Sequence, residues 1–250
     1  MFRISRRIKM SIMLAGFFGL AAQVFALSGE EIIRKMESNQ VHSTSESVGS
    51  MAISDRFGTR TKSYKAFNEG EDKMLLEFTN PEEAGQKILR TDDEIYLYFP
   101  EAEEIIHLQG SALKDSVMGS DFSYEDLTGG KGLLDTYRVT LEGNETVDGH
   151  DCYRLKLEAK TRDAVYQLER VWVDKQLFAY RKVVLYSLSG KPVKEMHITD
   201  FKKIGGKNIP VLMEMRDLMK KNSKTVFTTE SMSIDVPLDP YLFSLEELSW

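Results

Sequence analysis

The chain has 250 residues, a formal net charge of −6 and a single cysteine. This length suits one domain. The acidic balance argues against a nucleic-acid partner, because binding nucleic acid needs a basic surface. A single cysteine cannot form an internal disulfide. Cys152 is therefore expected to be a small, buried apolar side chain.

Residues 1–26 have the pattern of a cleaved secretory signal peptide. Four basic residues between positions 3 and 9 precede an apolar run over residues 11–22, and Val24 and Ala26 stand three and one residues before a cut after Ala26. The run is shorter than the ~20 residues that span a bilayer, which favours cleavage over an uncleaved anchor. Removing the leader changes the net charge from −6 to −10. We expect a mature chain that works outside the cytoplasm and is not itself lipidated, because no cysteine lies near the cut.

The predicted mature chain opens with a helix. Ser28 and Glu31 have the spacing of a capping box. Ile32, Ile33 and Met36 then follow on one side, at helical spacing. This pattern predicts a helix whose apolar side packs against the rest of the domain.

After residue 42 the pattern changes to short segments separated by turns. Apolar and polar residues alternate in 74–79, 137–142 and 153–159, residues 95–99 are apolar on both faces, and further strands are expected at 166–173, 178–187, 193–202, 209–217 and 224–235. Regular short strands with this period indicate an antiparallel barrel or a strongly curved sheet. No repeat or linker interrupts residues 27–250, so we expect a single, mainly β domain.

Residues 111–135 interrupt the series of strands. They lack regular alternation and include several glycines, which predicts a loop with one or two short helices lying over the sheet. Phe122 and Tyr124 are aromatic residues inside this otherwise polar segment. Two interpretations stay open for them: a mobile lid at the mouth of a cavity, or a fixed plug that closes one end of the barrel.

No reaction centre is evident in the sequence. The four histidines have no metal-ligand spacing, and His107 and His197 fall within strands, where structural histidines are expected. We therefore expect a protein without enzyme activity, metal or cofactor.

A curved sheet with an apolar concave face must cover that face with side chains, helices or a ligand. The opening helix, the irregular segment and a short C-terminal piece are the available cover. Methionines such as Met74 and Met213 suit either an ordinary core or irregular acyl chains. The candidate lipid-binding residues are Ile32, Ile33, Met36, Met74, Leu76, Phe78, Ile95, Leu97, Phe99, Phe122, Tyr124, Tyr137, Val139, Tyr153, Leu155 and Leu157.

Several motifs carry a family resemblance. The segments 78–81 (FTNP) and 96–100 (YLYFP), and above all the block 119–127 (GSDFSYEDL), resemble outer-membrane lipoprotein-sorting proteins of the LolA/LolB-like superfamily. The resemblance implies an incomplete, half-open antiparallel barrel of about eleven strands covered by a few α-helices.

The same resemblance implies a function. It suggests a monomeric periplasmic chaperone that shields the acyl chains of lipoproteins or other lipids during transfer towards the outer membrane. Its partners would be an inner-membrane transporter and an outer-membrane acceptor. Two alternatives remain: an accessory lipid-binding module of a membrane lipid transporter, and a hydrolase whose site is not recognised.

Overall fold

The structure is a computed structural model that describes residues 27–40, 42–70, 72–92, 94–128, 132–162 and 164–249. The predicted signal peptide, residues 1–26, lies outside these ranges. Among the described residues, no helix has the length and apolar character needed to cross a membrane.

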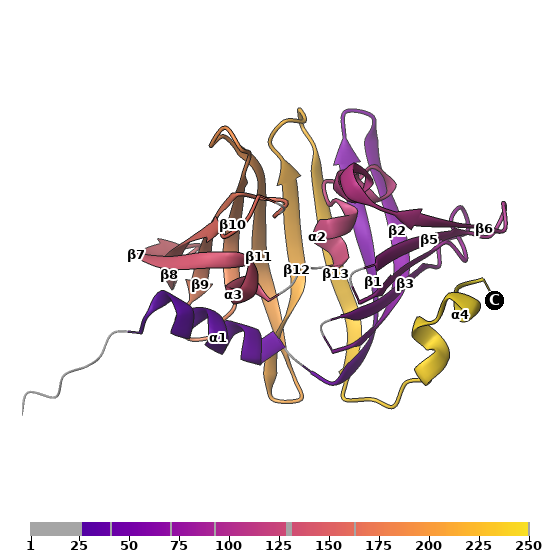
Figure 1. Ribbon diagram of the computed structural model, residues 1–250, viewed down its shortest axis with the longest axis horizontal. Coiled ribbons are helices and arrows are strands. Elements are labelled where there is room, and N and C mark those ends of the chain that lie inside the picture. Colours follow the sequence, from indigo (N-terminus) through magenta and orange to yellow (C-terminus); the bar gives the residue numbers. More distant parts are fainter. Residues whose placement is uncertain are drawn as a thin grey trace, which may run out of the picture.

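The described residues form one antiparallel sheet of thirteen strands, ordered β6-β5-β4-β3-β2-β1-β13-β12-β11-β10-β9-β8-β7 (Figure 1). The strands are β1 (Thr44–Asp55), β2 (Gly58–Glu69), β3 (Lys73–Phe78), β4 (Lys87–Thr91), β5 (Glu94–Phe99), β6 (Glu104–Leu108), β7 (Tyr137–Val147), β8 (His150–Ala159), β9 (Leu168–Asp174), β10 (Tyr180–Tyr186), β11 (Pro192–Ile204), β12 (Lys207–Asp217) and β13 (Lys224–Ile234). The edge strands β6 and β7 do not pair, so the barrel stays open. The predicted mainly β, half-open fold is confirmed.

The sheet has thirteen strands where about eleven were expected. Strand β2 is hard to recognise because Lys62 occupies an inward position opposite Met51. The Lys62 ammonium is buried and forms ion pairs with Glu82 and Glu83 from the turn after β3. A buried ion pair thus replaces the apolar residue that would have marked the alternation.

The first helix, α1 (Gly29–Gln40), begins as predicted. The Ser28 N–H donates to Glu31 Oε2 at 2.7 Å, and the Glu31 N–H donates to Ser28 Oγ at 3.2 Å. Ile32, Ile33 and Met36 are fully buried against the half of the sheet formed by β7–β10. The predicted placement of this helix is confirmed.

A long crossover joins the two edges of the sheet. Because β6 and β7 are consecutive in the chain but lie at opposite edges, the segment between them, described over residues 109–128 and 132–136, crosses the molecule. This crossover contains the 3₁₀ turns η1 (Gly110–Lys114) and η2 (Val117–Gly119) and the short helices α2 (Tyr124–Thr128) and α3 (Leu133–Thr136). It lies over the concave face, with α2 and α3 in front of the middle strands (Figure 1).

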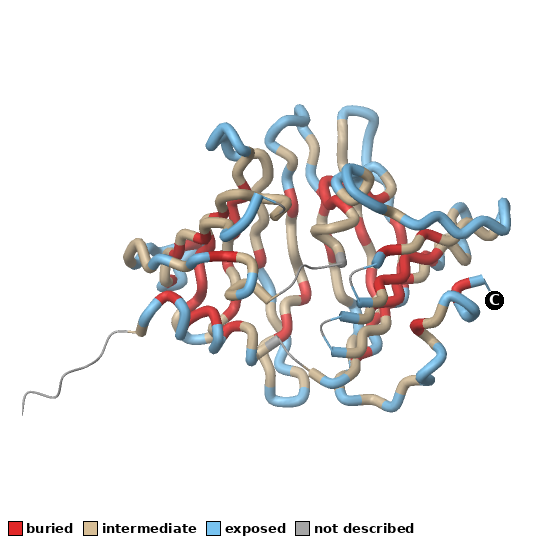
Figure 2. Tube along the Cα trace, in the orientation of Figure 1, coloured by how far each residue is buried: buried red, intermediate tan, exposed pale blue. Residues whose placement is uncertain are grey.

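Two apolar clusters occupy the concave face, one on each half of the sheet. The first combines β1–β5 with crossover residues such as Phe122, and the second combines α1 with β7–β10. Buried residues are accordingly concentrated in two zones, left and right of the central strands (Figure 2).

The C-terminal piece covers the other face, contrary to the sequence-based expectation. The turn η3 (Pro240–Phe243) and helix α4 (Leu245–Leu248) place Phe243 and Leu248 against Leu75 and Leu89. Leu75 alternates with the inward-facing residues of β3, so this contact is on the convex face. Strands β3–β5 have apolar residues on both of their faces, so both faces of this part of the sheet must be covered.

Candidate ligand cavity

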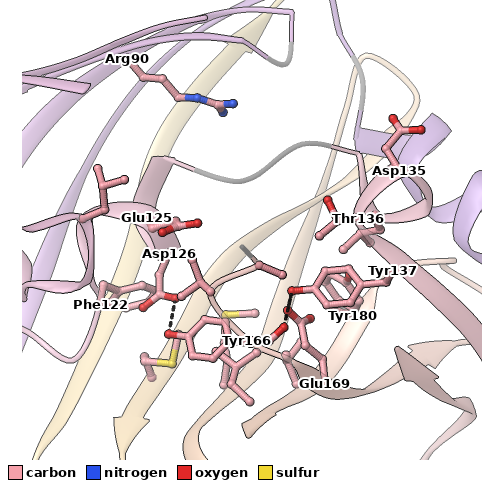
Figure 3. Close-up of a pocket in the computed structure, with 18 of the residues that line it drawn as sticks. Arg90, Phe122, Glu125, Asp126, Asp135, Thr136, Tyr137, Tyr166, Glu169 and Tyr180 are labelled. Carbon is pink, nitrogen blue, oxygen red and sulfur yellow. Dashed lines mark hydrogen bonds between the residues drawn. The ribbon is translucent and has the colours of Figure 1, made fainter. Parts of the chain in front are cut away.

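A cavity of about 610 Å³ lies between the sheet and the crossover (Figure 3). Its size falls in the range of ordinary small-molecule sites. The lining comes from β4 and β5, from the crossover and the start of β7, from the connection between β8 and β9, and from the inward faces of β9–β12. The residues are Arg90, Ile95, Leu113, Phe122, Glu125, Asp126, Leu133, Asp135, Thr136, Tyr137, Thr161, Ala164, Val165, Tyr166, Glu169, Tyr180, Val183, Leu185, Met196 and Met215.

All sixteen candidate residues from the sequence belong to the two concave-face clusters, either as buried members or packed against them. Ile95, Phe122 and Tyr137 line the cavity itself. The other thirteen belong to the clusters but are not among the lining residues: Ile32, Ile33, Met36, Met74, Leu76, Phe78, Leu97, Phe99, Tyr124, Val139, Tyr153, Leu155 and Leu157. Their contact with lipid stays a prediction.

Phe122 holds the crossover against the sheet. Its side chain is 4 % exposed and meets Phe227 of β13 edge-to-face, with ring centroids 5.9 Å apart. On either side, Asp121 and Ser123 are buried, and the Ser123 N–H donates to Asp126 Oδ2 at 2.8 Å as a cap for α2. This packing favours the plug over the lid as the role of Phe122.

One wall of the cavity is polar. The Tyr137 hydroxyl donates a 2.6 Å hydrogen bond to Glu169 Oε1 (Figure 3). Glu169 is buried, with only 8 % of its surface exposed. Even so, it forms no ion pair with any described residue. Burial raises the pKa of the Glu169 carboxyl to about 7, while the hydrogen bond from Tyr137 opposes that shift. Near neutral pH this carboxyl is therefore a mixture of its protonated and ionised forms.

A second polar group links the crossover to the sheet. The Tyr166 hydroxyl donates to Asp126 Oδ1 at 2.9 Å, and the Lys194 ammonium of β11 pairs with Asp126 Oδ2. Burial, followed by the nearby Asp126 charge, raises the pKa of Tyr166, so its hydroxyl stays a donor. Burial and the adjacent Asp126 also raise the pKa of Glu125. Asp126 thus fixes α2 above the cavity through the β8–β9 connection and β11.

Sequence reasoning missed the polar lining of the cavity, which includes Arg90, Tyr166, Glu169 and Tyr180. A signal for Glu169 was present. It stands two and four residues before Val171 and Val173, both fully buried in the concave cluster, so period two places its side chain inward. Arg90 is likewise 6 % exposed and lies beside Ile95 across the β4–β5 pair.

The histidines in strands have structural partners, as predicted. His107 pairs with Glu94 and stacks on Tyr96 at 4.6 Å between ring centroids. His197 Nε2 lies 2.8 Å from Glu195 Oε1. The part of the chain that the structure describes contains no group of three or more potential metal-ligating side chains, and Cys152 is buried and unpaired with another cysteine.

Comparison with known proteins relates the chain to a family and a fold. A family model described as "Uncharacterized protein" matches residues 70–250, more than half of the chain. A DUF1329 family protein from Desulfovibrio piger is similar in structure, with a TM-score of 0.82, 26% identity, and coverage of 88% of this chain and 97% of that one. None of the curated proteins matches this sequence.

Two further solved structures share the fold at lower identity. One is described as an outer-membrane lipoprotein-sorting protein domain from Vibrio parahaemolyticus, with a TM-score of 0.82, 21% identity, and coverage of 89% of this chain and 98% of that one. The other is a LolA superfamily protein from Nitrosomonas europaea, with a TM-score of 0.73, 22% identity, and coverage of 89% and 100%. The LolA-like fold expected from the motifs is confirmed.

Proposed function

Because this chain belongs to the family defined by the model that spans residues 70–250 and has a LolA-like fold, we propose that it is a periplasmic, non-enzymatic lipid carrier. Its cargo would be the acyl chains of lipoproteins or of another lipid, and its direction of transfer would be towards the outer membrane. An inner-membrane transporter and an outer-membrane acceptor would be its partners.

The cavity beneath the crossover is the observation that carries this proposal. It lies between two apolar clusters and is lined by side chains such as Leu113, Val183 and Met215. Each methylene that leaves water for such a surface contributes ~0.8 kcal/mol, so an acyl chain gains affinity without any chemical step. The polar wall around Glu169 suits an amphiphile, whose polar group would find hydrogen-bonding partners there.

The direct test has two parts. Protein purified from its native periplasm would be extracted with organic solvent and examined by mass spectrometry, which should reveal acyl lipids. The same sample should have the intact mass of a chain that begins at Leu27, since the leader would have been removed. Absence of any extracted lipid, together with no binding of a fluorescent fatty acid, would refute the carrier function.

A cavity-filling variant locates the binding site. Val165 lines the cavity from the β8–β9 connection and is half-buried, so Val165→Trp should occupy part of the space with little effect on folding. We expect affinity for the fluorescent fatty acid to fall about tenfold, the loss of roughly two buried methylenes. Leu188→Trp, at an 87 % exposed position on a hairpin turn, is the matched control and should bind normally.

A further inference from the structure

Three neighbouring hairpins point their turns to the same end of the sheet. They join β1 to β2, β10 to β11 and β12 to β13, and their six strands are contiguous in the sheet as β2-β1-β13-β12-β11-β10. The register places Ser54 opposite Lys224 and Lys194 opposite Asp217, which brings the three turns to one end. Figure 1 shows them side by side at the top of the view. We call residues 55–60, 187–191 and 216–224 the hairpin tips.

Each hairpin tip exposes a large apolar side chain. Leu188 is 87 % exposed, Phe57 is 82 % exposed and Met219 is 73 % exposed, which makes them the three most exposed large apolar side chains in the described part of the chain. Leu218, beside Met219, is 45 % exposed. A single exposed apolar residue needs no explanation, but one at the tip of each of three adjacent hairpins forms a pattern that folding does not require.

The same tips are basic in an otherwise acidic protein. They contain seven lysines and arginines but only two aspartates, whereas the whole chain has a formal net charge of −6. Arg56 lies over the Phe57 ring at 4.5 Å from its centroid. Arg56, Lys191 and Lys221 are exposed and form no ion pair with any described residue. The rest of the surface therefore carries the excess negative charge, and the tips have the opposite sign.

We propose that the hairpin tips dock the protein on the surface of an anionic phospholipid bilayer. Apolar side chains at the apex would enter the interfacial region while the flanking basic side chains contact lipid phosphates, the arrangement expected of interfacial anchors. The acidic remainder would be repelled by the same surface, so the protein approaches with its tips first. This function goes beyond lipid carriage and does not depend on it, because the tips need no cargo to bind.

The spacing of the tips favours a bilayer over a protein partner. Neighbouring strands lie about 4.8 Å apart, so adjacent hairpins are separated by roughly 10 Å. Their apolar residues are isolated points with basic and polar residues between them, whereas the centre of a protein interface is a continuous apolar patch depleted of charge. A fluid bilayer accepts separate anchors without a complementary shape.

Sedimentation with protein-free vesicles tests the proposal. We expect the predicted mature chain to bind vesicles of phosphatidylglycerol mixed with phosphatidylcholine at least tenfold more tightly than vesicles of phosphatidylcholine alone. The variant F57S/L188S/M219S should lose at least tenfold in binding. Its matched control is Y241S/L245S, which removes two exposed apolar side chains, 69 % and 43 % exposed, from the C-terminal piece and should bind normally.

Two further variants separate the contributions of charge and insertion. R56Q/K191Q/K221Q should lose the preference for anionic vesicles while its folding is unchanged. Phe57→Trp should show a blue-shifted emission component when anionic vesicles are added, as an indole does on leaving water. Failure of the wild-type chain to bind either vesicle, or an equal loss in Y241S/L245S, would overturn the proposal. Binding to native membranes but not to protein-free vesicles would overturn it in favour of a protein receptor.

Discussion

Asp121 and Thr225 form two reciprocal hydrogen bonds that attach the crossover to the middle of the sheet. The Asp121 N–H donates to Thr225 Oγ1 at 2.9 Å, and the Thr225 hydroxyl donates to Asp121 Oδ2 at 3.0 Å. The Ser223 hydroxyl donates to the other carboxylate oxygen at 2.6 Å. Both Asp121 and Thr225 are fully buried, so these bonds are shielded from water. The cover over the cavity is therefore fixed to β13 at one point of its length.

Thr225→Val should lower the free energy of unfolding by about 1–3 kcal/mol, because it leaves a buried N–H and a buried carboxylate oxygen without this partner. Thr228→Val is the matched control in the same strand, since the Thr228 hydroxyl makes no hydrogen bond to a described residue. It should change stability by no more than about 0.5 kcal/mol. Urea unfolding of both variants checks this prediction. If both substitutions lowered the free energy of unfolding equally, the Asp121–Thr225 pair would not anchor the crossover.

Phe122→Ala should lower the free energy of unfolding by about 3–5 kcal/mol, because a buried ring that contacts Phe227 leaves a cavity behind. A lid would behave differently, with near-normal stability and weakened binding of a fluorescent fatty acid. Thermal unfolding and binding at low temperature, measured on the same samples, distinguish the two roles. A variant that melts normally but binds weakly would show that Phe122 is a lid residue after all.

The alternation of apolar residues predicted much of the fold because its period directly encodes the two faces of a strand. Met74, Leu76 and Phe78 face inward as expected, and Leu155 and Leu157 do so in β8. The extent of the sheet was underestimated where polar residues occupy inward positions. The order of the strands depends on contacts across the whole chain, so the local pattern did not reveal that the consecutive strands β6 and β7 lie at opposite edges.

The cavity was predicted less completely than the sheet. Apolar lining follows from alternation, but buried polar residues depend on partners that are distant in sequence. Glu169 and Tyr137 are thirty-two residues apart and meet only because β7, β8 and β9 are neighbours. The C-terminal piece was assigned to the wrong face because nothing in its own sequence distinguishes the concave from the convex side.

Ile33→Asp should destabilise the protein by roughly 4 kcal/mol, because it removes apolar contacts and places a charge without a partner in a fully buried position. Leu188→Asp makes a closely similar chemical change where the side chain is 87 % exposed, and should leave stability almost unchanged. Thermal unfolding at neutral pH compares the two. An unchanged melting temperature for Ile33→Asp would show that α1 does not pack on the sheet in solution.

Glu169 should make the stability of the protein depend on pH between about 4.5 and 7. The pKa of this carboxyl rises from its ordinary value of 4.5 to about 7 in the folded protein, mainly through burial. The folded state then binds more protons than the unfolded state in this interval, so its stability falls as the pH rises. The loss of folding free energy caused by ionising Glu169 is absent below pH 4.5 and complete above pH 7. It then reaches roughly 3 kcal/mol, at 1.36 kcal/mol per pKa unit.

Glu169→Gln removes this titration while keeping an acceptor for the Tyr137 hydroxyl. Relative to the wild-type protein, it should be more stable by up to roughly 3 kcal/mol at pH 8 and about equally stable at pH 4.5. Taking the difference between the two proteins at each pH removes the contribution of every other carboxyl group. Tyr137→Phe is the complementary variant: without the hydrogen bond that opposes the shift, the pKa of Glu169 should rise further and extend the slope to higher pH. Urea unfolding at pH 4.5, 6, 7 and 8 measures these differences, and a Glu169→Gln difference that stays constant across the series would show that the carboxyl is hydrated rather than buried.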